Sequence, residues 1–404
     1  MRIRSAASAC RVSCFAVSVL ICLFGASRGA SATNRTVHVG QGGLKFVDEV
    51  SGTSTSNINT GDTIDWVWSA GFHSTTSGTC TTSCTPDGLW DSGGHSTPFT
   101  YSRDFSSAGT FHYYCSVHGT AMQGTVIVTD LGPAPTVTSV NPTSGAAATT
   151  NPFTITGTNF VAGAIVTVGG ANASGENVTD PTSMTATTPV LTPGTLNDVV
   201  VTNPDTQSGT LTAGWMADFL DVPQSDPFHQ YVETIFRNGV TAGCSGGNYC
   251  RDTPVSRAQM AVFLLKAEHG SAYTPPACIP PGIFPDVPCP GQFTDWIERL
   301  SAEGITGGCA GGNYCPNDAV TRQQMAVFLL KTHDGSAYNP PDCIGIFDDV
   351  PCTPGVGFSD WIEELSNRNI TGGCAVGPPP LYCPTNPNTR GQMAVFLTKT
   401  FFVP

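Results

Sequence analysis

The chain has 404 residues, of which only 12% are charged, and it contains 45 glycines and 31 prolines. This length predicts two to four domains, and this composition is typical of small β domains with many turns rather than of long helices or coiled coils. The formal net charge of −13 argues against a nucleic-acid partner, because proteins that bind a phosphate backbone present basic patches.

Residues 1–32 predict a secretory signal peptide. Three arginines between positions 2 and 11 supply positive charge, residues 15–25 form an apolar core, and residues 30–32 form a small-residue cleavage site. A membrane anchor is the alternative interpretation, but the apolar run is short for a span, and no other segment could cross a membrane. We therefore expect a secreted, extracytoplasmic protein of the cell envelope or cell surface, with no membrane span in the mature chain.

The number of cysteines points to one that does not form a disulfide. Of sixteen cysteines, Cys10, Cys14 and Cys22 lie in the predicted signal peptide, which leaves thirteen. In an exported protein most cysteines pair, so an odd number requires another role for one of them.

Residues 33–130 predict a β-sandwich. Apolar and polar residues alternate in short runs broken by Gly, Ser and Thr, and these runs are 36–39, 63–68, 110–115 and 124–128. Residues 131–135 are a Pro- and Gly-containing linker to the next segment.

A potential metal site follows the strand predicted over 111–115. Cys115, His118 and Met122 lie within eight residues, so a loop that folds back brings a thiolate, an imidazole and a thioether to one point. His73, at the end of another predicted strand, is well placed as a fourth ligand. Two His, one Cys and a weak axial Met are the ligand set of type-1 (blue) copper, because soft sulfur stabilises Cu(I) and imidazole suits both oxidation states. This interpretation predicts one copper ion per chain and gives the odd cysteine its role.

Two other interpretations of these residues stay open. Cys115 could be a buried free thiol and His118 an ordinary surface residue. His95 is a candidate spare ligand in a loop, while His38 and His112 are expected to be structural or surface histidines.

The Tyr-Cys-x-x-His loop, the Met that follows it and the Gly-Phe-His segment at 71–73 resemble plastocyanin-like cupredoxins over roughly residues 36–129. The resemblance implies a copper protein of the electron-transfer class, with its ligands at His73, Cys115, His118 and Met122. Upstream, Cys80 and Cys84 are expected to form a disulfide that pins the loop after His73, with a second metal site as the alternative.

Residues 131–215 form a second β-rich segment that carries almost no charge. Its phrases at 137–145, 153–160 and 199–205 resemble the immunoglobulin-like IPT/TIG family. The resemblance implies a seven-strand sandwich that serves as a spacer or an interaction module.

Residues 216–404 contain a threefold repeat, over about 217–279, 280–343 and 344–404. Each repeat opens with Phe-x-Asp-Val-Pro and closes with Ser/Thr-Arg-x-Gln-Met-Ala-Val-Phe-Leu, and each predicts two short helices, the second capped by its Ser or Thr. A fixed period indicates stacked units that share a core. The three copies resemble S-layer homology (SLH) repeats, a family that attaches proteins to cell-envelope polysaccharide.

The SLH resemblance implies a glycan-binding arginine in each repeat, at Arg257, Arg322 and Arg390. A guanidinium there could bind an acidic sugar group through two hydrogen bonds. The Glu of the family motif is replaced by Gln259, Gln324 and Gln392 in the three copies. The residues leave a structural alternative open, in which the arginines pair with Asp221, Asp286 or Asp349.

Ten cysteines in the repeats predict five disulfides, because the cysteines recur at corresponding positions. The expected pairs are Cys244–Cys250, Cys309–Cys315, Cys374–Cys383, Cys278–Cys289 and Cys343–Cys352. Zinc is the alternative, but an exported context and the lack of nearby histidines favour disulfides.

The sequence therefore predicts a multidomain chain with a cupredoxin β-sandwich, an Ig-like β-sandwich and a mainly helical SLH region. The leading function is single-electron transfer by a surface-anchored copper protein whose redox partner is not indicated. A structural or adhesive surface protein and a copper storage or delivery protein are the alternatives. We expect no enzyme activity, because the sequence has no nucleophile elbow, paired-carboxylate motif or phosphate loop.

Overall fold

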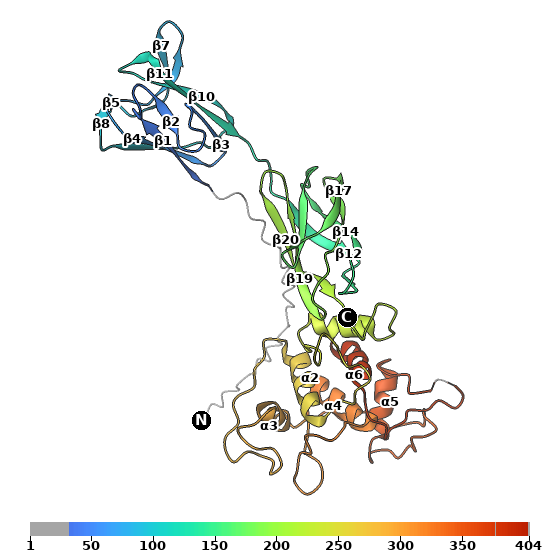
Figure 1. The fold of residues 1–404 in the computed structure, drawn as a ribbon. Coiled ribbons are helices and arrows are strands. Elements are labelled where there is room, and N and C mark those ends of the chain that lie inside the picture. Colours follow the sequence, from blue (N-terminus) through green and yellow to red (C-terminus); the bar gives the residue numbers. More distant parts are fainter. Residues whose placement is uncertain (1–31, 376, 403–404) are drawn as a thin grey trace, which may run out of the picture.

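A computed structural model describes residues 32–375 and 377–402, so nearly all of the predicted signal peptide lies outside the described residues. Figure 1 shows three parts in chain order, two built from strands and a third built mainly from helices. Among the described residues, none of the helices combines the length and the apolar character that a membrane span requires.

The first part is a sandwich of two sheets. One sheet has the order β2-β1-β4-β9 and the other β3-β11-β10-β6-β7, while β5 and β8 form a separate short pair. The strands are β1 (Asn34–Val39), β2 (Phe46–Asp48), β3 (Thr55–Asn59), β4 (Thr63–Trp68), β5 (Phe72–His73), β6 (Thr76–Cys80), β7 (Cys84–Asp91), β8 (His95–Ser96), β9 (Thr100–Asp104), β10 (Gly109–Cys115) and β11 (Gly119–Thr129).

The core of this sandwich follows from the alternation seen in the sequence. Along β4, the buried residues are Ile64, Trp66 and Trp68, and the residues between them are less buried. Trp66 lies at the centre of an aromatic cluster, 5.3 Å from Tyr113 and 5.6 Å from Trp90 between ring centroids. Aromatic side chains of this size dominate the energetics of a small core.

The loop that carries the candidate ligands is shorter than expected. The sequence predicted a loop until the strand resumed at 124–128, but β11 begins at Gly119 and contains Met122. Cys115 pairs with Gly119 across a shift in strand register, and Gly119 has a positive φ of 54°, a conformation that glycine adopts without strain. Only three residues, 116–118, therefore separate the two strands.

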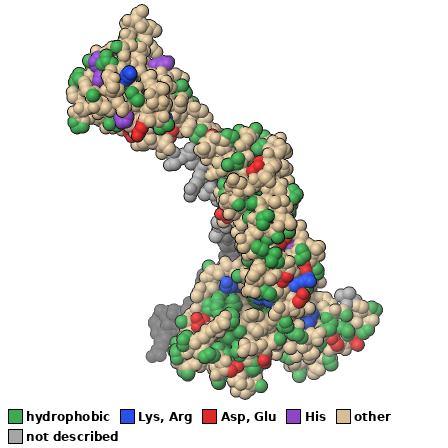
Figure 2. All heavy atoms as spheres, viewed as in Figure 1, with side chains coloured by type: hydrophobic (Ala, Val, Ile, Leu, Met, Phe, Trp, Pro, Cys, Tyr) green, Lys and Arg blue, Asp and Glu red, His purple; other side chains and the backbone are tan. Residues whose placement is uncertain are grey.

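The second part is also a two-sheet sandwich, with strand orders β12-β14-β18-β17 and β13-β20-β19-β15-β16. It has nine strands rather than the seven expected, and two of them are only two residues long. Its strands are β12 (Thr136–Asn141), β13 (Ser144–Gly145), β14 (Pro152–Thr158), β15 (Ile165–Val168), β16 (Ala171–Asn172), β17 (Ser174–Asp180), β18 (Ser183–Thr187), β19 (Thr195–Thr202) and β20 (Ser208–Ala217). In Figure 2 the visible face of this part carries few charged side chains.

The third part contains two helices per repeat, as expected. They are α1 (His229–Arg237), α2 (Arg257–His269), α3 (Thr294–Ala302), α4 (Arg322–Asp334), α5 (Ser359–Asn367) and α6 (Arg390–Leu397), followed by the π-helix η1 (Thr398–Phe402). The second helix of each repeat begins at the predicted cap, which is Ser256, Thr321 or Thr389. The Gln three residues later completes a capping box in all three copies, so the Gln that replaces the family Glu has a structural role.

The three repeats close on one another instead of forming an open stack. Backbone bridges join Pro254 to Thr389, Ser256 to Ala319, and Thr321 to Pro387, so the third repeat contacts the first as well as the second. A single hydrophobic cluster runs through all three repeats and includes Met216 from the end of β20.

The Ig-like part is fastened to the first repeat by Glu233 of α1. Its carboxylate accepts hydrogen bonds from Thr143 Oγ1 (2.9 Å) and Ser144 Oγ (3.2 Å) of the Ig-like part. Glu298 and Glu363 occupy the same motif position in the other repeats, but they accept backbone amides from the disulfide-closed loops that precede their own helices. In the first repeat, the Ig-like part therefore supplies the hydrogen-bond donors that a disulfide-closed loop supplies to the equivalent glutamate in the other two repeats.

Candidate metal centre

The candidate ligands come from two neighbouring segments of the first sandwich. His73 is the last residue of β5, Cys115 the last residue of β10, and His118 the end of the short loop before β11. Strand β6 follows His73 almost at once and pairs with β10, with Thr76 opposite Tyr114. This pairing holds the segment after His73 beside the end of β10, so the ligands converge although they are about 40 residues apart in sequence.

Three donor atoms form a compact triangle. Cys115 Sγ lies 3.2 Å from His118 Nδ1 and 3.8 Å from His73 Nδ1, and the two Nδ1 atoms lie 3.2 Å apart. A point equidistant from the three atoms is roughly 2 Å from each, close to an ordinary metal–imidazole bond of ~2.0–2.1 Å and shorter than a metal–thiolate bond of ~2.3 Å. The residues present therefore fit a small metal ion bound by two imidazoles and one thiolate.

The other ring nitrogen of His73 faces protein backbone. A side-chain carbon added at Gly40 or Gly71 would lie 2.7 or 2.5 Å from His73 Nε2, so both glycines allow the backbone to approach the ring. Burial and the nearby His118 lower the pKa of His73, while a hydrogen bond to the backbone of Ala70 opposes this shift. A second ring nitrogen held by backbone, with the first turned toward the site, is the usual arrangement of a metal-binding histidine.

Cys115 is completely buried and is the one free cysteine among the described residues. Its sulfur accepts a hydrogen bond from the backbone amide of Ser74 at 3.3 Å. A donor of this kind stabilises a thiolate and influences the reduction potential of a metal bound to it.

Ser74 and its neighbours contact the segments of the candidate ligands, and the sequence analysis missed them. Four consecutive polar residues, 74–77, are buried directly after His73. The Ser74 hydroxyl accepts the backbone amide of Ser116 at 2.7 Å and contacts Ser116 Oγ at 2.8 Å, which ties the two ligand segments together. The available signal was this run of Ser and Thr, because four small polar residues in succession break the alternation of the surrounding strands.

The fourth predicted ligand, Met122, and the other histidines of the first sandwich lie outside the triangle of donor atoms. Met122 is buried, 1% exposed, in the same core cluster as Cys115. His95 pairs with His73 in strand register, but its ring stacks on Phe99 and its Nε2 lies 2.8 Å from the carbonyl oxygen of Ser92. His38 and His112 contact the hydroxyls of Ser69 and Thr125, respectively, which agrees with structural or surface roles.

All twelve cysteines expected in disulfides are joined with the expected partners. Cys80 and Cys84 close the hairpin between β6 and β7, and a side-chain carbon at Gly119 would lie 3.6 Å from Cys84 Sγ. Cys343 and Cys352 lie near Glu363, but their sulfurs are bonded to each other and the carboxylate accepts three backbone amides. The structure therefore favours disulfides over zinc at this cluster.

The three arginines proposed for glycan binding are buried and contact the neighbouring repeat. Each donates Nε–H to a tyrosine carbonyl oxygen at 2.7–2.8 Å, and the same tyrosine hydroxyl donates back to the arginine carbonyl oxygen at 2.8–3.0 Å. The guanidinium also lies over the tyrosine ring, 4.7–4.8 Å from its centroid. We call these pairs the Arg–Tyr clasps, and they are Arg257–Tyr314, Arg322–Tyr382 and Arg390–Tyr249.

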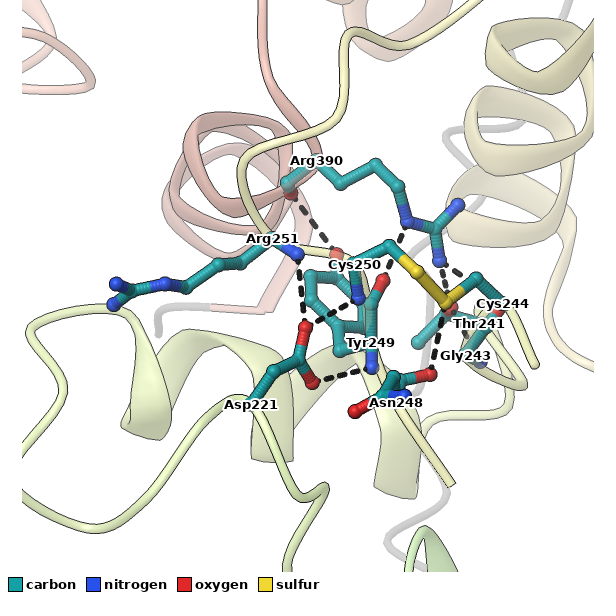
Figure 3. Close-up of a disulfide and its surroundings, with 9 residues drawn as sticks. All are labelled: Asp221, Thr241, Gly243, Cys244, Asn248, Tyr249, Cys250, Arg251 and Arg390. Carbon is teal, nitrogen blue, oxygen red and sulfur yellow. Dashed lines mark hydrogen bonds between the residues drawn. A yellow bond between two sulfur atoms is a disulfide. The ribbon is translucent and has the colours of Figure 1, made fainter. Parts of the chain in front are cut away.

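Among the described residues these arginines make no direct ion pair with Asp221, Asp286 or Asp349, and each aspartate acts on its arginine only as a nearby charge. Asp221 instead accepts the backbone amides of Tyr249 and Cys250, both at 2.7 Å, within the loop closed by Cys244–Cys250 (Figure 3). Asp286 and Asp349 do the same in the other repeats. The aspartate fixes the loop, and the loop presents its tyrosine carbonyl to the arginine.

The clasps differ in how completely the guanidinium is satisfied. Arg257 Nη2 donates to Gly308 O, and Arg390 Nη2 donates to Gly243 O, both at 3.1 Å. Arg322 Nη2 is buried and has no hydrogen-bond partner among the described residues, and Arg322 lines a groove of about 300 Å³. Other residues lining this groove are Thr371, Gly372, Gln392 and Lys399. An unsatisfied buried donor of a charged group is costly, which makes this groove suited to an anionic ligand.

Comparison with known proteins identifies two of the three parts. A family model for the IPT/TIG domain matches residues 135–213, and a family model for the S-layer homology domain matches residues 218–261 and 292–326. The third repeat lies outside these matched ranges but has the same helices, cap and disulfides as the other two. No curated protein matches the chain.

Solved structures of amicyanin mutants are similar to part of the chain. A Cu(I) form is 22% identical, covers 24% of this chain and 81% of that chain, and has a TM-score of 0.19. A reduced form is 24% identical, covers 25% and 85%, and has a TM-score of 0.19. A likeness of this size carries no argument about function. The chain thus contains an N-terminal β region with a possible His-Cys-His metal site, an IPT/TIG domain and S-layer homology repeats.

Proposed function

We propose that the N-terminal β region is a cupredoxin that holds one type-1 copper ion and transfers single electrons outside the cytoplasm. The observation that carries this proposal is the triangle of Cys115 Sγ, His73 Nδ1 and His118 Nδ1, built from two strand ends and the three-residue loop before β11. Copper bound there would supply a one-electron Cu(II)/Cu(I) couple. Met122 on β11, buried in the same core cluster as Cys115, would supply a thioether as a further ligand.

The protein's own residues suit this role in two ways. The disulfide, the strand pairing and the buried hydroxyls hold the donor atoms in place, and a fixed geometry reduces the rearrangement that accompanies a change of charge. His118 is only half-buried, and Val117 beside it is 48% exposed, while Phe72 beside His73 is 54% exposed. This gives a redox partner, whose identity the proposal leaves open, an apolar contact surface next to a ligand imidazole.

The test is the visible absorption and EPR spectrum of the full chain after loading with Cu(II). We expect an intense thiolate-to-copper charge-transfer band and narrow copper hyperfine splitting, both lost in Cys115→Ser and retained in His112→Ala, a surface imidazole on the same strand. An ordinary tetragonal Cu(II) signal that Cys115→Ser does not change would overturn the proposal.

Redox and copper-binding measurements on the same full chain distinguish electron transfer from the alternative functions. Reversible oxidation and reduction with fast self-exchange supports an electron carrier. Binding of Cu(I) without a stable Cu(II) state would instead indicate copper storage or delivery. No metal binding at all would leave a structural or adhesive surface protein.

We also propose that the SLH repeats attach the chain to an acidic cell-envelope polysaccharide through the groove at Arg322. Arg322 and Lys399 both line this groove and give it positive charge, although the Lys399 ammonium also donates to Asn369 O at 3.0 Å. Co-sedimentation of the full chain with purified envelope polysaccharide tests this, with Lys399→Ala expected to weaken binding. Lys266→Ala is the matched control. Lys266 lies at the corresponding position and, like Lys399, donates to a backbone carbonyl oxygen, but the arginine beside its helix, Arg390, has its Nη2 bonded to Gly243 O. Equal binding by both variants would contradict the assignment.

A further inference from the structure

A chain of hydroxyl groups connects a surface carboxylate to the ligand loop. Thr76 Oγ1 donates to Asp91 Oδ1 at 2.9 Å and lies 3.0 Å from Ser74 Oγ. Ser74 Oγ in turn contacts the hydroxyl of Ser116 at 2.8 Å and accepts its amide at 2.7 Å. Ser74 and Thr76 are buried, while Asp91 and Ser116 are exposed. The chain thus crosses from β7 through β6 to the residue that follows Cys115.

The direction of every hydrogen bond in this chain follows from Asp91. An ionised carboxylate can only accept, so the single proton of the Thr76 hydroxyl points toward Asp91. Thr76 Oγ1 must then accept from Ser74, which uses the single proton of the Ser74 hydroxyl. Ser74 Oγ is left with its two lone pairs, and these accept both the N–H and the O–H of Ser116.

This direction matters at the metal centre. With its hydroxyl proton turned toward Thr76, Ser74 holds Ser116 by two hydrogen bonds and so fixes the loop between Cys115 and His118. The same residue donates its backbone amide to Cys115 Sγ. If the Ser74 hydroxyl donated to Ser116 Oγ instead, the Ser116 hydroxyl could no longer donate to Ser74. The segment could then adopt more than one pattern of hydrogen bonds.

We propose that Asp91 is a positioning residue of the metal centre, acting through Thr76 and Ser74 on the Cys115–His118 loop and on the amide bond to the thiolate. This inference rests on the proposed copper site for its effect on redox behaviour, but the hydrogen-bond chain is formed by protein atoms alone. Asp91 also accepts the amide of Gly93 at 3.0 Å, which holds the carboxylate in place.

The first test measures the midpoint potential of the copper-loaded full chain. Asp91→Ala removes the terminal acceptor, so we expect a lower potential, because a weaker amide bond to the sulfur stabilises the thiolate less and favours Cu(II). Asp91→Asn keeps a carbonyl acceptor for Thr76 and should restore most of the wild-type potential. Asp87→Ala is the matched control, since Asp87 lies on the same strand but accepts the amide of Leu89 instead.

The second test needs no metal. Alkylation of Cys115 in the metal-free full chain is followed by mass spectrometry of its peptide, with an expected several-fold faster reaction in Asp91→Ala and Ser74→Ala than in wild type or Asp87→Ala. If the alkylation rates and potentials of Asp91→Ala and Asp87→Ala are the same, Asp91 has no positioning role. If wild type shows no type-1 spectrum but the alkylation rates differ as expected, the copper proposal fails and the positioning inference survives.

Discussion

At the metal centre, two imidazoles and a thiol turn their donor atoms toward one another at 3.2–3.8 Å, whereas in the repeats three buried arginines turn theirs toward tyrosine carbonyl oxygens. Both arrangements join segments that are distant in the sequence. The first leaves space for an ion and the second fills its space with protein atoms. A buried polar side chain therefore indicates binding only when its partners within the chain do not already satisfy it.

This difference predicts opposite responses to substitution in the two regions. The metal centre should lose its metal but keep its fold, since most of the sandwich core is formed by residues other than Cys115 and Met122. The clasps should lose stability, because their arginines connect each repeat to the next.

The largest effect on stability is expected for Arg390→Ala. This change removes the hydrogen bonds to Tyr249 O and Gly243 O and opens the contact between the third and first repeats. We expect the free energy of unfolding of the repeats to fall by roughly 3–5 kcal/mol, measured by urea unfolding of the full chain followed by far-UV circular dichroism. Arg299→Ala is the control, because its half-buried pair with Glu303 lies within one helix turn and should contribute less than ~1 kcal/mol. Equal losses in the two variants would contradict the role of the clasp.

Acid should affect the N-terminal sandwich through Asp48. Burial alone would raise the pKa of this carboxyl, but hydrogen bonds from Arg35 and from the amide of Ser51 lower it to about 2. The folded pKa is below the unfolded value, so the stabilisation is present above pH ~4 and is lost as the pH falls toward 2, with a size of about 2 kcal/mol. Thermal unfolding across this pH range should show the loss in wild type and not in Asp48→Asn, whereas Asp180→Asn should behave like wild type.

Removal of a disulfide should have different effects on stability in the repeats and in the N-terminal sandwich. The double change Cys244→Ser and Cys250→Ser frees the loop that presents Tyr249 to Arg390 (Figure 3), and we expect a loss of roughly 2 kcal/mol in the unfolding of the repeats. The corresponding change at Cys80 and Cys84 should leave this helical transition unchanged and instead loosen the hairpin beside Gly119. A helical transition that shifts equally in both variants would argue against separate roles.

The smallest effect is expected for Tyr249→Phe, which removes only the hydroxyl that donates to Arg390 O at 3.0 Å. The cost should be about 1 kcal/mol, because the ring stays in place under the guanidinium. By the threefold equivalence of the clasps, Tyr314→Phe and Tyr382→Phe should cost the same within error. A much larger cost at one position would show that the three tyrosine hydroxyl bonds are not equivalent.

The fold of the chain could be predicted from its sequence to a considerable extent. The period-2 alternation in 63–68 predicted β4 with its full bounds, and the Ser/Thr-Arg motif predicted the start of α2, α4 and α6. The extent of β11 was not predictable, because it depends on a shift in strand register at Cys115 and on a glycine in the left-handed region.

The candidate sites could be predicted only in part. His73, Cys115 and His118 were named because their side chains are the chemically distinctive groups of this region, and the structure brings these three together. Ser74, Thr76, Ser116 and Asp91 carry no distinctive chemistry, and their roles arise from contacts between strands. For Arg257 and Arg390, the motif gave the residue but not its partner, because the tyrosine comes from another repeat.

The sequence by itself determined the three parts of the chain and the residue types available for a metal, because periodicity and repeats are local properties. It predicted the six disulfide pairs from cysteine spacing, but their connectivity came from the structure. Only the tertiary structure decided which polar groups satisfy one another. It closed three repeats on themselves through the Arg–Tyr clasps, placed the Ig-like part on Glu233, and directed a chain of hydroxyls from Asp91 toward Cys115. These outcomes depend on distances between segments that only packing brings together, so no local pattern could predict them.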